Sequence, residues 1–172
     1  WGGGSALEPL TADQLREASK SFNPSTSWTY DGFHPRHFAM LSDEALLALS
    51  DIYQASECMG MLPTNVQQVV VALIPKPKGG HRPIGIFTGP ERLWAKARLP
   101  LLEKWEAENP RGYVACRTGG AALDAVWSQA LRAEAKVSDG GVAGALLWDL
   151  ASFFDTIDHD VLRQRCIHKG IS

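Results

Sequence analysis

The stretch LLWDLASFFD carries two aspartates six residues apart, Asp149 and Asp155. Residues 142–149 are largely apolar and do not alternate with polar residues, a pattern typical of a strand buried on both faces. A carboxylate at the end of such a strand needs a cation, a metal or several hydrogen-bond donors. Mg²⁺ suits this position, because it binds one or two carboxylates together with substrate phosphates. The alternative is that Asp149 only bonds to a turn, with Phe153 and Phe154 packed in the core.

Phe154 follows Asp149 by five residues. In a continuous strand an odd separation places two side chains on opposite faces of the sheet. The strand must therefore bend after Asp149 if both residues are to line one pocket.

A second cluster of chemistry-bearing residues lies in LIPKPKGGHRPIGI, where Lys76, Lys78 and Arg82 fall within seven residues. Residues 69–74 and 81–87 favour strands, and Gly79 and Gly80 favour a tight turn between them. The resulting β-hairpin has a basic tip. Lysine supplies a point charge and arginine a forked donor, so the three side chains together suit a polyanion such as a phosphate chain. Charges that only keep an exposed hairpin soluble are the alternative.

The net charge of the 172 residues is −2, which conceals a basic middle region. Residues 76–117 contain nine Lys and Arg against four Asp and Glu, a net of +5. This region is a candidate anion-binding surface, with a solvated charged face as the alternative. The three cysteines are widely spaced and match no zinc pattern, which favours reduced thiols in an intracellular protein, nuclear or cytoplasmic. No apolar run approaches the roughly 18 residues that span a membrane, so no membrane association is expected.

The remaining elements are mainly helical, and the expected fold class is α+β. A flexible segment is expected at residues 1–10. Helices are expected at about 11–20, 35–58, 90–108, 121–136 and 159–169, with Pro100 kinking or breaking the third. The fourth is amphipathic, with an apolar side formed by Leu123, Val126, Trp127 and Leu131.

Four stretches together resemble the reverse transcriptase family, in particular the enzymes of non-LTR retrotransposons and group II introns. IPKPKGGHRPIGI is followed about sixty residues later by WDLASFFDTIDHDVLRQRCIHKGI. YDGFHPRHF is similar to an early segment of that family's fingers subdomain, and GYVACRTGGAALDAVW is similar to its GFRxGRST segment and the helix after it. The resemblance covers roughly residues 28–171.

The resemblance implies one partial reverse transcriptase domain at residues 11–172. The fingers subdomain, made of helices and a basic hairpin, would cover about 11–137. The start of the palm, its first strand and helix, would cover about 138–172.

The resemblance also implies roles for individual residues. Asp149 would be the first catalytic aspartate and a ligand of two Mg²⁺ ions, with the backbone carbonyl of Leu150 as a further ligand. Phe154 would stand beneath the sugar of the incoming nucleotide, and Asp155 would orient the turn. The incoming triphosphate would be held by Arg82 with Lys76 or Lys78.

The partners implied are an RNA template, a DNA or RNA primer and deoxynucleoside triphosphates. Arg117 would contact the template, although CRTGG lacks the family's usual small hydroxyl residue after the second glycine. Trp28 and Tyr30 are candidates for stacking on template bases, but their residue types favour core packing.

One feature of the family is missing from the 172 residues. They contain no Tyr-x-Asp-Asp segment, which supplies the family's remaining catalytic carboxylates. We therefore expect that the chain alone does not polymerise DNA and that it is a fragment of a longer polymerase. Two alternatives stay open: a catalytically inactive relic or binding module that holds RNA or nucleotide through the hairpin, and an unrelated domain whose aspartate is structural.

Overall fold

A computed structural model describes residues 7–110, 120–150 and 153–170. The described part combines helices with a small two-stranded antiparallel sheet, so the fold is α+β as expected. The chain divides into two compact units, one reaching to Pro100 and the other beginning at Leu101. The expected flexibility of residues 1–6 lies outside the described residues.

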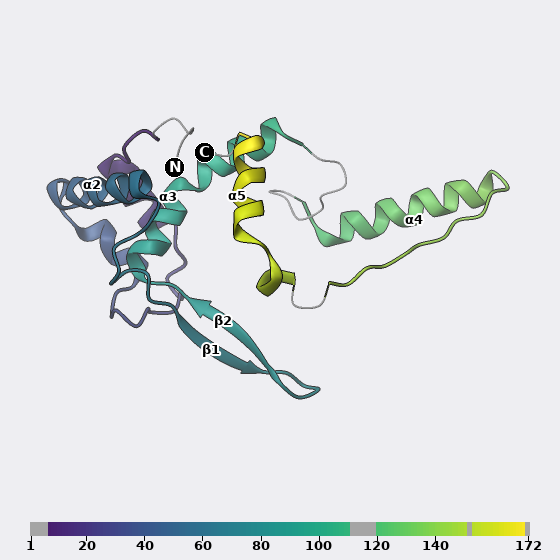
Figure 1. The fold of residues 1–172 in the computed structure, drawn as a ribbon, viewed down its shortest axis with the longest axis horizontal. Helices are drawn as coiled ribbons and strands as arrows, with labels where there is room; N and C mark the ends of the chain where they lie inside the picture. The colour runs from purple at the N-terminus through teal and green to yellow at the C-terminus, as the bar shows by residue number, and fades with distance from the viewer. Residues whose placement is uncertain (1–6, 111–119, 151–152, 171–172) are drawn as a thin grey trace. The chain divides into compact units, whose positions relative to one another are not determined.

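The elements follow one another along the chain as Figure 1 shows. The first unit contains the helices α1 (Ala12–Lys20), η1 (Pro35–Met40) and α2 (Asp43–Met59), and the strands β1 (Val70–Pro75) and β2 (His81–Ile86). The helix α3 (Gly89–Glu108) begins in the first unit and ends in the second. The second unit also contains α4 (Ala122–Ser138), η2 (Phe153–Thr156) and α5 (His159–His168).

Local side-chain chemistry sets several helix ends. Thr11 and Gln14 form a reciprocal capping box at α1: the Thr11 hydroxyl accepts from the Gln14 amide at 3.1 Å, and the Gln14 side chain accepts from the Thr11 amide at 2.9 Å. Gly60 ends α2 with a φ of +69°, a conformation that glycine adopts without steric cost. The Asp158 carboxylate caps α5 by accepting from the amides of Asp160 and Val161.

The single helix expected at 35–58 is two elements. A short 3₁₀ helix, η1, ends before Leu41, whose backbone is extended with φ −72° and ψ +151°. Ser42 then caps α2 by accepting a hydrogen bond from the Ala45 amide at 3.3 Å. The helical spacing of apolar residues continues through this point, but the serine offers the backbone an alternative partner and starts a new helix.

The buried core lies in the first unit. It consists of apolar side chains from the segment before α1 and from α1, η1, α2 and α3: Leu10, Leu15, Phe38, Leu46, Tyr53 and Leu93. The Tyr53 hydroxyl donates to the Pro90 carbonyl at 2.7 Å, which joins α2 to the start of α3. Because Leu10 is 3% exposed, the packed structure already includes the end of the segment that the sequence assigns to a flexible terminus.

A largely buried ion pair joins the same two helices. The Glu57 carboxylate accepts two bonds from the Arg98 guanidinium and one from the Trp94 indole, each at 2.7 Å. The side chains of Glu57 and Arg98 are each 13% exposed. Arg98 also donates to the Glu8 carbonyl at 2.9 Å, so one guanidinium joins three segments of the first unit. Bidentate pairing of this kind fixes geometry as well as charge.

Pro100 lies inside α3, and the helix continues past it to Glu108. Of the expected kink or break, the break does not occur, and the boundary between the two units falls at this residue.

The second unit contrasts with the first in burial. Neither α4 nor α5 contains a buried residue among those described. The expected apolar side of α4 faces solvent: Leu123, Val126, Trp127 and Leu131 are each 60–62% exposed. Within this unit the Trp105 indole donates to the Lys169 carbonyl at 2.8 Å, a contact between the end of α3 and the end of α5.

Candidate nucleic-acid interface

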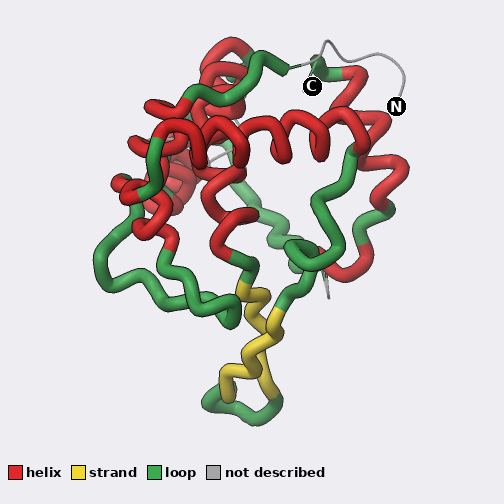
Figure 2. Tube along the Cα trace, turned by 90° about the vertical axis from the view of Figure 1, so that its left-hand side faces the viewer, coloured by secondary structure: helices red, strands yellow, loops and turns green. Residues whose placement is uncertain are grey.

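The β-hairpin forms as the sequence predicts. Strands β1 and β2 pair antiparallel, with Ile74 opposite Arg82 and Pro75 opposite His81. The loop between them is closed by a bond from the Lys76 amide to the Gly80 carbonyl at 3.0 Å. Gly79 and Gly80 have φ of +90° and +78°, so both glycines are needed for the turn. The hairpin projects from the helices of the first unit in two perpendicular views (Figures 1 and 2).

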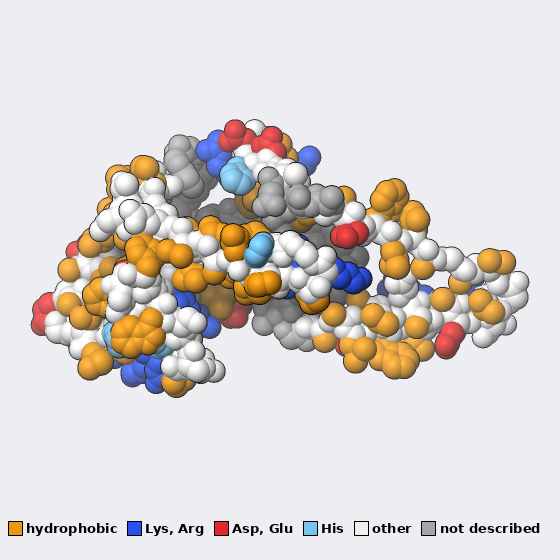
Figure 3. Space-filling model, turned by 90° about the horizontal axis from the view of Figure 1, so that it is seen from below, with side chains coloured by type: hydrophobic (Ala, Val, Ile, Leu, Met, Phe, Trp, Pro, Cys, Tyr) orange, Lys and Arg blue, Asp and Glu red, His pale blue; other side chains and the backbone are white. Residues whose placement is uncertain are grey.

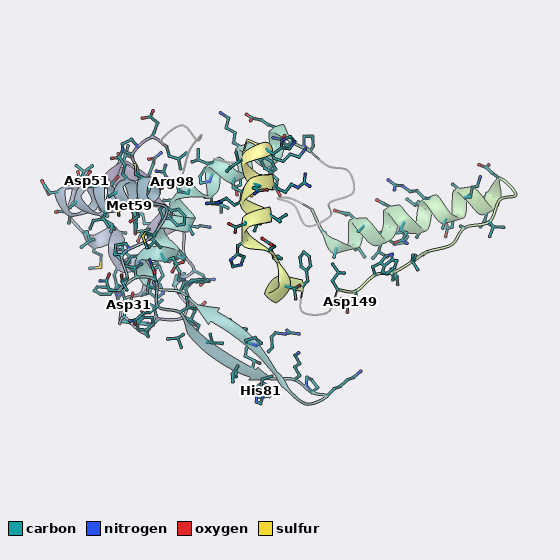
Figure 4. All side chains as sticks on the ribbon, in the orientation of Figure 1. Asp31, Asp51, Met59, His81, Arg98 and Asp149 are labelled. Atoms are coloured by element: carbon teal, nitrogen blue, oxygen red, sulfur yellow. The ribbon has the colours of Figure 1, made fainter. Side chains whose placement is uncertain are left out.

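The register determines which cations share a face. Side chains alternate between the two faces of a strand, and Lys76 follows Ile74 by two residues. Arg82 lies on the face that carries Ile74, and Lys76, the residue after β1, continues the alternation toward that face because its amide bonds to Gly80. Lys78 lies in the loop at the tip, and His81 lies on the opposite face; Figure 4 labels His81 near that tip.

The cations of the hairpin, Lys76, Lys78 and Arg82, are all exposed. Within the described ranges, none of them pairs with a carboxylate. Their charge is thus available to an external anion, and the apolar residues Ile74 and Ile84 beside Arg82 are also about half exposed, at 47% and 42%.

The predicted strand at 142–149 is wrong. Residues 142–150 have no regular secondary structure and are exposed, with Val142, Leu147 and Trp148 at 91%, 86% and 82%. A run of apolar residues indicates a preference for burial, but a strand also needs a neighbouring strand to bond to. In the described part of the chain, both strands are already paired with each other.

Asp149 is consequently an exposed carboxylate on an extended segment, as Figure 4 shows. The Leu150 side chain beside it is 62% exposed. No group of three or more His, Cys, Asp and Glu side chains in the described ranges is arranged to hold a metal ion. The residues described here do not by themselves fit a site for two Mg²⁺ ions, because such sites require several oxygen ligands around each ion.

Three further predicted site residues are only partly described. Phe154 and Asp155 lie on η2, a turn of 3₁₀ helix. Their side chains, and the whole of Arg117, lie outside the described residues.

The preference for core packing of Trp28 and Tyr30 is wrong. Their side chains are 62% and 45% exposed, and neither belongs to the core cluster. Phe33, on the same loop, is 52% exposed.

The sequence reasoning missed Asp31, the carboxylate that organises this loop. One oxygen accepts from the Thr29 hydroxyl and from the Phe33 amide at 3.0 Å, and the other accepts from the Gly89 amide at 2.9 Å. Partial burial opposes ionisation of this carboxyl, but the hydrogen bonds from Thr29, Gly89 and Phe33 outweigh it and lower the pKa of Asp31. The local signal was the Asp-Gly pair in YDGF, which indicates a turn; Gly32 has a φ of +76°.

The Gly89 amide donates to Asp31 at a point that leaves little room for a side chain. A Cβ at Gly89 would lie 3.2 Å from the Phe38 ring and 3.4 Å from the Asp31 carboxylate. The end of the hairpin, the start of α3 and the loop at 28–34 are therefore fixed together.

No protein-family model matches the chain, and no curated protein matches it. Among the helices described, none combines the length and apolar character needed to cross a membrane.

Proposed function

We propose that this chain supplies the fingers and the first part of the palm of an RNA-directed DNA polymerase of a retroelement. In this proposal the hairpin binds the phosphates of an incoming deoxynucleoside triphosphate. The observation that carries it is the exposed pair Lys76 and Arg82, which share one face and have no internal partner in the described structure. The four sequence stretches that resemble reverse transcriptases support the same proposal.

The chemistry of the hairpin matches that ligand. A triphosphate carries several negative charges on a short chain of oxygens, and the guanidinium of Arg82 can grip two of them at once. Lys76 adds a compact charge on the same face, and Lys78 adds a third from the tip. Fixed cations stabilise the charge that shifts onto the phosphates during nucleotidyl transfer.

We propose further that the chain does not polymerise DNA without additional residues. Asp149 is the one carboxylate that the resemblance assigns to the metals within these 172 residues, and the sequence contains no Tyr-x-Asp-Asp. Residues that complete the metal site would also be expected to pair with the exposed segment at 142–150. Strand pairing would satisfy its backbone and bury its apolar side chains.

A second function, a non-catalytic module that binds RNA or nucleotide, is favoured by the exposure of Asp149. In this alternative the hairpin keeps its affinity for phosphates, and the aspartate has no role in binding.

Charge reversal on the hairpin tests the binding that both functions share. The double variant Lys76→Glu/Arg82→Glu is compared with Lys136→Glu, which changes an exposed lysine on α4. Binding of a fluorescent RNA and of deoxythymidine triphosphate is measured by polarisation and by competition. We expect the double variant to bind at least roughly tenfold more weakly, with a reduced dependence on salt, and the control to change little. Equal affinity of the double variant and the wild type would overturn both functions.

The variant Asp149→Asn distinguishes the polymerase fragment from the non-catalytic binding module. A role in holding metal-bound nucleotide predicts that this variant weakens triphosphate binding in Mg²⁺ and leaves binding without Mg²⁺ unchanged. A binding module predicts no difference in either condition. Primer extension by the wild-type chain is expected to give no Mg²⁺-dependent product, and a product would contradict the need for further residues.

A further inference from the structure

The loop at residues 28–34 has an inverted pattern of burial. Its polar residues Thr29 and His34 are 5% and 6% exposed, whereas its aromatic residues Trp28, Tyr30 and Phe33 are 45–62% exposed. A loop normally buries its apolar side chains and exposes its polar ones, so a buried polar group beside an exposed aromatic patch is informative. We call the three exposed aromatic residues the aromatic platform.

The buried polar groups hold the loop in a single shape. The Thr29 hydroxyl donates to Asp31 and contacts the Phe33 carbonyl at 2.9 Å. Asp31 in turn binds the Gly89 amide at the start of α3. The aromatic platform is therefore attached to a helix that contributes Leu93 to the core. Rigid presentation lowers the entropy lost when a ligand binds.

Individual rings of the platform are also held in place. The Trp28 ring meets the His37 ring edge to face, with centroids 5.1 Å apart, and meets the His34 ring at 6.1 Å. The Tyr30 hydroxyl lies 3.3 Å from the Gln68 side chain, two residues before β1. Tyr30 thereby connects the platform to the base of the basic hairpin.

Cations adjoin the platform. The Arg92 guanidinium donates to the Ser27 carbonyl at 3.1 Å and lies 5.5 Å from the centre of the Phe22 ring. Arg36 donates to the Phe22 carbonyl at 3.1 Å. Neither arginine forms an ion pair within the described ranges. Figure 3 shows hydrophobic side chains next to Lys and Arg side chains at lower left, on the face seen from below.

We propose that the aromatic platform binds single-stranded nucleic acid by stacking on its bases, while the adjoining arginines and the hairpin contact its phosphates. Exposed rings with cations nearby suit this ligand, because every base has a π-face and every phosphodiester a negative charge. Duplex bases are already stacked on each other and offer no free face to the rings. The inference rests on the proposed function, since it identifies where a template strand would lie beside the hairpin.

Removing bases from the ligand tests stacking directly. Two labelled oligonucleotides of about twelve nucleotides, a length typical of single-strand sites, are compared: one carries bases and one is abasic throughout. The proteins are the wild type, Trp28→Ala, Trp28→Ala/Tyr30→Ala and, as a matched control, Trp127→Ala, which removes an equally exposed ring from α4. Circular dichroism checks that each is folded. The single variant keeps the test valid if the double variant does not fold.

We expect the wild type and the control to bind the base-bearing strand at least roughly tenfold more tightly than the abasic strand. We expect this preference for the base-bearing strand to fall in Trp28→Ala and to vanish in the double variant. The affinity for the abasic strand should stay unchanged in both. Equal affinity of the wild type for both strands, or a preference that survives both substitutions, would overturn stacking at the platform while leaving phosphate binding by the hairpin intact. Failure to bind either strand would overturn the inference and the proposed function together.

Discussion

The two units of this chain have similar proportions of apolar residues in their helices but very different burial. In the first unit, α1, η1, α2 and α3 surround six buried apolar side chains. In the second, the apolar side of α4 and the run at 142–150 are mostly more than half exposed, and the described part of α4 and α5 buries nothing. Apolar patterning alone therefore does not produce a core. A helix needs a partner face at the correct distance, and the first unit provides one within its own residues.

The largest expected difference between the units is the cost of truncating an apolar side chain. Leu46→Ala removes a side chain with 0% exposure and should lower the free energy of unfolding by about 2–5 kcal/mol. Leu131→Ala, at 60% exposure on α4, should change it by less than about 0.5 kcal/mol. Urea unfolding followed by circular dichroism measures both. Similar losses of unfolding free energy in the two variants would show that α4 is packed in solution. The difference in burial between the two units would then not hold.

A smaller effect is expected from the ion pair that joins α2 and α3. Glu57→Gln leaves the Arg98 guanidinium largely buried without its counter-ion, and should cost about 1.5–3 kcal/mol, the range for hydrogen bonds to charged groups. Glu17→Gln is the matched control, because the Glu17 pair with Lys20 is exposed and contributes little. Thermal unfolding of both variants provides the comparison, and equal melting temperatures would contradict a stabilising role for Glu57.

The stability of the first unit should depend on pH through Asp31, in the loop that carries the aromatic platform. Because the pKa of Asp31 is lowered in the folded state, its ionised form stabilises the fold above the ordinary titration range, near pH 4. That contribution is lost as the pH falls through the lowered folded pKa. Asp31→Asn should therefore be less stable than the wild type at neutral pH, and the difference should shrink in acid.

The control for this measurement is Asp13→Asn, since the Asp13 side chain is 94% exposed. Unfolding free energies are measured from about pH 7 to about pH 2, a range that covers carboxyl titration. A difference between Asp31→Asn and the wild type that stays constant with pH would show that the hydrogen bonds do not depend on ionisation of Asp31.

The smallest expected effect on stability comes from the exposed surface of the second unit. Trp127→Ser should leave the unfolding transition almost unchanged, because the ring is 60% exposed. It should nevertheless reduce the fluorescence of an apolar dye such as ANS, which binds exposed hydrophobic surface. A loss of stability without a change in dye binding would indicate that the α4 surface is covered in solution.

Local chemistry accounts for the parts of the fold that the sequence predicts well. Thr11 and Gln14, Gly60, Asp158 and the Gly79–Gly80 pair each act within a few residues, and the structure places a cap or turn at every one. The position of Lys76 and Arg82 on one face follows from the same local register.

Non-local partners account for the parts that could not be predicted. The run at 142–149 has the composition of a buried strand, yet whether it becomes one depends on a neighbour that its own sequence does not encode. Asp31 binds Gly89 across 58 positions, and no spacing rule connects them. The bond fixes Asp31, in the same loop as the exposed Trp28 and Tyr30, to the start of α3.

Pro100 also has a practical consequence for dissecting the molecule. Proline has no N–H to donate, so the Lys96 carbonyl one turn earlier lacks its usual helical partner. All six core residues precede this position, as do the hairpin and the aromatic platform. A gene shortened to end at Pro100 should consequently encode an autonomous domain that keeps the whole proposed binding surface.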